Sequence, residues 1–126
     1  MQKLLMTVFF WMAAGAAQAE AVSHHGGPIL HCTPPQFFDE SPAAESSVAS
    51  VDEFTLSASD NTDPSTVTVW VNNTKIPAHI EQQRSGRWLI KGKLVAPITS
   101  GRVWFKVTGD SQEGCDELRV WNVYIR

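Results

Sequence analysis

Hydrophobic and polar residues alternate along most of the chain from Val51 onward, which is the pattern of β-strands with one buried face. No segment shows the 3.6-residue spacing of an amphipathic helix. Turn residues divide the alternating region into predicted strands over 52–58, 66–72, 76–80, 87–94, 102–108 and 118–125, and a further strand is expected near 35–39. Short strands with frequent turns predict an all-β fold, an antiparallel β-sandwich of about seven strands.

Two stretches depart from this alternation. Residues 20–35 contain glycine, proline and histidine without a sustained apolar period, so we expect a flexible, histidine-containing arm. Residues 39–50 are small, polar and rich in turn formers, which predicts a loop or a poorly ordered edge. Pro77 places the strand 76–80 at a sheet edge, because proline has no N–H to give to a neighbour. The sandwich is therefore expected over 36–126.

The first residues have the composition of a secretory signal peptide. Lys3 precedes an apolar run from Leu4 to about Gly15, and small residues follow. The run of about 12 apolar residues is shorter than the roughly 20 that cross a bilayer. We expect a signal peptide over 1–19, with an alternative end at Ala21, and a periplasmic or secreted protein with no membrane span after processing.

Export affects the expected chemical state of the two cysteines. In an oxidising compartment, Cys32 and Cys115 are expected to form one disulfide, and only one pairing exists. Closing a loop of roughly 80 residues removes on the order of 4 to 5 kcal/mol of unfolded-chain entropy at most.

Composition excludes several function classes. The chain has 126 residues, of which 43% are hydrophobic and 18% charged, which fits one domain with a real core. The net charge is −3 and the basic residues are scattered, so the sequence predicts no basic patch that could bind nucleic acid. No G-x-S-x-G motif occurs, and no histidine stands in a nucleophile–base–acid pattern. We therefore expect a protein that is not an enzyme.

Three features of the region from Val51 to Ile125 resemble bacterial immunoglobulin-like or fibronectin-III-like domains. They are the stretch SASDNTDPSTVTVWVNN, the G-x-W strand start at Gly86-Arg87-Trp88, and a late Gly-Cys turn before an aromatic last strand. A fainter resemblance is to periplasmic copper-binding proteins of the CopC type, through Ser41-Pro42-Ala43 and the histidine-rich arm. The first resemblance implies an immunoglobulin-like β-sandwich, and the second implies a copper-binding role.

Histidines form the main candidate metal site. His24, His25 and His31 lie close together in the arm, and imidazole suits Cu(II) or another divalent transition metal. Cleavage after Ala21 would start the mature chain with Val22-Ser23-His24. Its amine, two amides and one imidazole can then surround Cu(II) in a square plane. The alternative interpretation is a solvated linker whose histidines bind nothing.

Two other features could bind ions less specifically. Asp60, Asn61 and Asp63 could hold Ca²⁺, but such residues also build turns without metal. His79 is expected at the surface of an edge strand.

Aromatic residues suggest a different function class. If the valines of 66–72 and 102–108 face the core, Trp70 and Trp104 face outward. Immunoglobulin-like strand order would place Trp70, Trp104 and Tyr124 on one outer surface. Such a surface could bind a carbohydrate or a protein partner, or the chain's own arm could cover it. Trp88 and Trp121 are assigned to the core.

Overall fold

Nine strands and no helix make up residues 32–126, the part of the chain that this computed structural model describes. The strands are β1 (Phe37–Ser41), β2 (Ser47–Val48), β3 (Val51–Ala58), β4 (Thr62–Val71), β5 (Thr74–Ile76), β6 (Ala78–Gln82), β7 (Trp88–Ile98), β8 (Arg102–Ser111) and β9 (Asp116–Ile125). The all-β prediction is confirmed. The predicted signal peptide lies outside the described residues.

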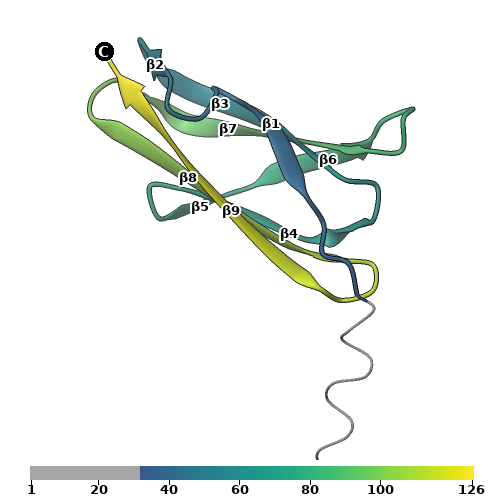
Figure 1. Cartoon of the computed structure of the whole chain (residues 1–126). Helices are drawn as coiled ribbons and strands as arrows, with labels where there is room; N and C mark the ends of the chain where they lie inside the picture. Colours follow the sequence, from purple (N-terminus) through teal and green to yellow (C-terminus); the bar gives the residue numbers. More distant parts are fainter. Residues whose placement is uncertain (1–31) are drawn as a thin grey trace, which may run out of the picture. The chain divides into compact units, whose positions relative to one another are not determined.

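The strands form two sheets (Figure 1). The first has the order β1-β3-β7-β6 and the second has the order β2-β9-β8-β4-β5. Every pairing is antiparallel except that of β2 with β9, which is parallel. The chain starts in the first sheet and crosses to the edge of the second, as in immunoglobulin-like sandwiches.

Two details differ from the sequence-based expectation. Part of the stretch 39–50, expected as a loop or a poorly ordered edge, adds strand residues at the end of β1 and in β2, which are both edge strands. The strand predicted over 76–80 divides at Pro77, so that β5 ends the second sheet and β6 ends the first. Proline cannot donate to a ladder, and here the chain leaves one sheet for the other at that residue.

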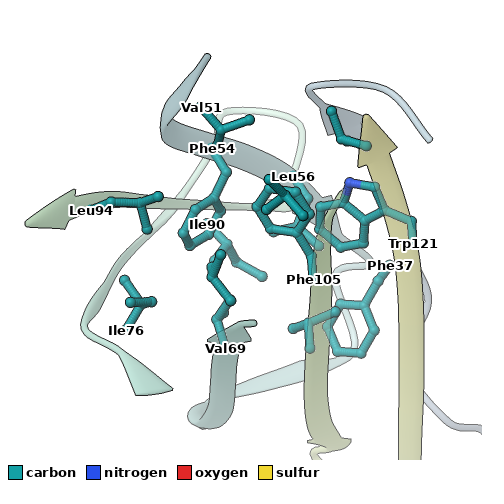
Figure 2. Close-up of a cluster of buried hydrophobic side chains, with 14 of the residues drawn as sticks. Phe37, Val51, Phe54, Leu56, Val69, Ile76, Ile90, Leu94, Phe105 and Trp121 are labelled. Atoms are coloured by element: carbon teal, nitrogen blue, oxygen red, sulfur yellow. The ribbon is translucent and has the colours of Figure 1, made fainter. Parts of the chain in front are cut away.

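An aromatic cluster joins the two sheets in the core. Phe105 and Trp121 lie directly opposite each other on β8 and β9, and their rings stack with centroids 4.7 Å apart. Phe54 from β3 meets Phe105 edge to face, with centroids 5.7 Å apart. Figure 2 shows these three rings among the buried side chains between the strands. The core position of Trp121 is confirmed, whereas Trp88 is only partly buried against the core.

Gly92 on β7 makes room for this cluster. It lies directly opposite Phe54 in the ladder between β3 and β7, and a Cβ at position 92 would overlap atoms of the Phe54 ring. Glycine in a strand interior weakens a sheet unless another group needs the space. Here the aromatic ring needs it.

The start of the described chain is tied to the second sheet. Both cysteines are disulfide-bonded, which confirms the link between Cys32 and the turn that joins β8 to β9. The Thr33 N–H donates to Glu113 Oε1 over 3.0 Å, and Asn61 Nδ2 donates to the Thr33 carbonyl over 3.2 Å. Pro35 is fully buried. Residues 33–35, expected as the end of the arm, therefore pack on the sandwich.

We expect the substitution Gly92→Ala to lower the free energy of unfolding by about 1–3 kcal/mol, because the added methyl group displaces the Phe54 ring from a packed core. Urea denaturation measures the change. The double variant Gly92→Ala/Phe54→Leu should lose less than the sum of the two single variants, since the smaller side chain accommodates the methyl group. Strict additivity would contradict this account of the glycine.

Candidate functional site

The three predicted surface aromatics share the outer face of the second sheet. The register places Trp70 on β4 opposite Lys106 on β8, and Trp104 on β8 opposite Asn122 on β9. Tyr124 on β9 lies opposite Arg102. Each aromatic residue is thus displaced by two positions from the one on the next strand, and the three form a diagonal stripe across β4, β8 and β9.

The two tryptophans of this stripe are only partly accessible. Lys106 Nζ lies 4.5 Å from the centroid of the Trp70 ring, a cation–π contact that covers one face of the indole. Trp104 is half-buried, and its backbone N–H donates to Asn72 Oδ1 over 2.9 Å. A sugar ring that stacks on Trp70 would have to displace the lysine ammonium.

The most exposed apolar residues of this face lie instead along β9. Leu118 is 53% exposed, Val120 47% and Tyr124 39%. They occupy alternate positions and so share one face of the strand. Of these three residues the sequence predicts only Tyr124 at the surface, because both alternating sets of the last strand are apolar. The buried Trp121, which the sequence also assigns to the core, decides between the two sets.

The histidines fall into two groups. His24, His25 and His31 lie outside the described residues. His79 lies exposed on the edge strand β6, as expected, with its Nε2 3.0 Å from Glu81 Oε1. This hydrogen bond, and next the positive charge of Lys91, lowers the pKa of Glu81 below its usual value.

The polar residues before Pro64 build a turn. The Ser59 hydroxyl donates to Asn61 Oδ1 over 2.5 Å, and Asn61 Nδ2 reaches the carbonyls of Thr33 and Pro34. Asp63 Oδ1 accepts hydrogen bonds from Ser65. Within residues 32–126, no group of three or more His, Cys, Asp or Glu side chains could hold a metal ion. Turn chemistry thus accounts for Asn61 and Asp63.

No protein-family model and no curated protein matches this sequence. The fold is similar to CopC from Methylosinus trichosporium OB3b, with a TM-score of 0.57 and 15% identity over 72% of this chain and 92% of that chain. It is equally similar to PcoC, a methionine-rich copper resistance protein from Escherichia coli, with a TM-score of 0.57 and 13% identity over 75% of this chain and 100% of that chain. These likenesses show a shared sandwich fold, and they confirm the fainter of the two resemblances at that level.

A tandem immunoglobulin module of a Drosophila receptor protein tyrosine phosphatase also matches, with a TM-score of 0.44 and 14% identity over 75% of this chain and 50% of that chain. The immunoglobulin-like assignment itself rests on the strand order. In the described part of the chain, no helix is long and apolar enough to cross a membrane.

We expect His79→Ala to raise the pKa of Glu81 toward its ordinary value, because the largest cause of its lowering is removed. Titration of the Glu81 carboxyl carbon by NMR measures this, and Lys91→Ala should cause a smaller rise. Because folding lowers this pKa, the carboxylate favours the folded state above its unfolded pKa. That contribution is lost as pH falls through the lowered value. An unchanged pKa in the His79 variant would contradict the assignment.

Proposed function

We propose that this protein is an exported, non-catalytic metal-binding module, most specifically a periplasmic copper-binding protein whose ligands are His24, His25 and His31. The observation that carries the proposal is the combination of a CopC-like and PcoC-like sandwich with a histidine cluster placed just before it in the sequence. Residues 32–126 offer no competing metal-ligand group. The disulfide of Cys32 and Cys115 supports export, because such bonds persist in oxidising compartments.

The nitrogen ligands determine which oxidation state this proposal names. Imidazole and deprotonated amide nitrogens in a square plane suit Cu(II), whereas thioether and thiolate sulfur suit Cu(I). PcoC is described as methionine-rich, but the three methionines of this chain are Met1, Met6 and Met12. Either predicted cleavage removes all three. Both cysteines are already joined. The mature chain is therefore proposed to bind Cu(II) rather than Cu(I).

Processing decides how the ligands are supplied. A chain that starts at Val22 offers its free amine and places His24 third, which completes a set of four nitrogens. A chain that starts at Glu20 can use only the imidazoles of the cluster. The mass of the exported chain distinguishes the two.

Titration of the mature protein with Cu(II) tests the proposal. We expect saturable binding of one ion with micromolar or tighter affinity, and an absorption and paramagnetic resonance spectrum typical of nitrogen ligands. His24→Ala and His25→Ala should each weaken binding by about tenfold or more, in line with the loss of a ligand or of its support. His79→Ala is the matched control and should leave the affinity unchanged. Absence of saturable binding, or equal losses in all variants, would refute the site.

Partner binding by the outer face of the second sheet is the second candidate function. The observation that favours it is the shared face of Trp70, Trp104 and Tyr124, with the exposed apolar residues of β9 beside them.

A carbohydrate ligand should shift the tryptophan fluorescence of the wild-type protein on titration with polysaccharides. Trp104→Ala should abolish that shift, because stacking on an aromatic ring supplies much of the binding energy in such sites. Ser85→Ala, on an exposed turn of the first sheet, is the control and should respond like the wild type. A wild-type spectrum that stays constant would exclude a carbohydrate role for this face.

A further inference from the structure

Strand β9 is paired along only part of one side. Strand β8 pairs with it from Asp116 to Tyr124. On the other side, β2 pairs only with Tyr124 and Ile125. The edge strands of the described sheets are β1, β2, β5 and β6, and each has at most five residues. Strand β9 has ten residues, and β2 covers only the last two of them on the side away from β8.

Hydrogen bonds near the end of β9 define which of its residues point to the open side. The Glu45 N–H donates to the Asn122 carbonyl over 2.7 Å, and the Tyr124 N–H donates to the Ser46 carbonyl over 2.9 Å. The even-numbered residues therefore direct their backbone groups away from β8. The ladder with β8 has no irregularity, so Leu118 and Val120 share this orientation. No other described residue bonds to their outward N–H and C=O groups.

The open stretch runs from Asp116 to Val120 and borders a groove. The groove has a volume of about 430 Å³ and lies between residues 35–38 and residues 117–120. The Leu118 and Val120 side chains on the outer face are 53% and 47% exposed. Apolar side chains next to unpaired backbone groups form a template for another strand.

We propose that this stretch pairs with the same stretch of a second copy of the chain, in an antiparallel β9–β9 contact centred on Leu118. Charge complementarity between the two stretches identifies a second copy of the chain as the binding partner. In this register Leu118 faces the partner's Leu118, and Glu117 faces the partner's Arg119. A shift of the centre by one residue would set Glu117 against the partner's Glu117, or Arg119 against the partner's Arg119. Like charges directly opposite destabilise a strand pair, so of these three registers only the one centred on Leu118 is complementary.

Arg119 can bind the carboxylate of the partner's Glu117 in addition to that of Glu40. Its Nη2 donates to Glu40 Oε2, but its Nε is shielded from solvent and has no acceptor among the described residues. An unsatisfied donor of this kind costs stability. The side chain as a whole remains 40% exposed and lines the same groove as Glu117. The partner's Glu117 would therefore approach a guanidinium whose hydrogen-bonding capacity is only partly used.

The expected contact is small. Three facing backbone pairs form about six main-chain hydrogen bonds, together with two Glu–Arg pairs and one leucine contact. Contacts of this size lie at the weak end of specific interfaces. The second sheets of the two copies would become one continuous sheet, and the dimer would form only as the concentration rises.

Sedimentation equilibrium of the mature, oxidised protein tests the proposal. The solution contains a chelator, so that metal bridging through the histidine cluster cannot contribute and the result is independent of the proposed copper site. We expect a monomer at low micromolar concentration and an apparent mass that approaches twice that value toward millimolar concentration. A monomer at every concentration would overturn the proposal, even if the same edge binds an unrelated peptide.

Charge variants test the register. Glu117→Arg alone and Arg119→Glu alone should each weaken self-association by about tenfold or more, because each sets like charges opposite each other. An equimolar mixture of the two variants should restore a dimer, since both pairs become complementary again. Glu53→Arg, an exposed position on β3, is the control and should dimerise like the wild type. Undiminished dimers of Glu117→Arg would refute the β9 contact.

Amide hydrogen exchange provides a test that needs no variant. The Leu118 and Val120 amides should exchange more slowly as concentration rises, because the new contact uses them. The Glu117 and Arg119 amides, which point toward β8, should change little. This test remains decisive if Arg119→Glu fails to fold beside Glu40. A dimer whose Leu118 and Val120 amides exchange as in the monomer would overturn the proposal.

Discussion

The stack of Phe105 on Trp121 is the contact on which the rest of the sandwich depends. Both rings belong to the second sheet, and Phe54 brings the first sheet against them through an edge-to-face contact. Gly92 leaves the space that Phe54 fills. Trp121 also donates its indole N–H to the Pro42 carbonyl, so the same residue holds the segment that crosses from β1 to β2. One side chain thus connects the core to the covering of the β9 edge.

The fold could be predicted from sequence because alternation is a local signal. The strands of β3, β4, β7, β8 and β9 follow period-two patterns, and export together with an even cysteine count predicts the disulfide. Strand β2 could not be predicted, since Ser47 and Val48 are ordered by hydrogen bonds to β9 that lie far away in sequence. The division at Pro77 could not be predicted either, because a proline indicates an edge strand but does not indicate to which sheet that strand belongs.

The candidate sites were predictable to different degrees. The outward direction of Trp70 and Trp104 follows from the valines beside them, but the lysine over Trp70 comes from a neighbouring strand and leaves no trace in the local pattern. The exposed pair Leu118 and Val120 was missed because apolar residues in a last strand predict burial. They are exposed because they project from the outer face of the second sheet, the face opposite to that of the buried Trp121. The histidine cluster rests on composition alone.

The disulfide has a mechanical consequence. It closes a covalent ring that contains β1 to β8, and among the described residues only β9 and the last residue lie outside it. A force applied to the two ends of the chain would pass through the sulfur atoms rather than through the enclosed strands. Within residues 32–126, only those after Cys115 could be pulled out, and fully extended they span roughly 40 Å. The sandwich would therefore resist stretching in all but its final strand.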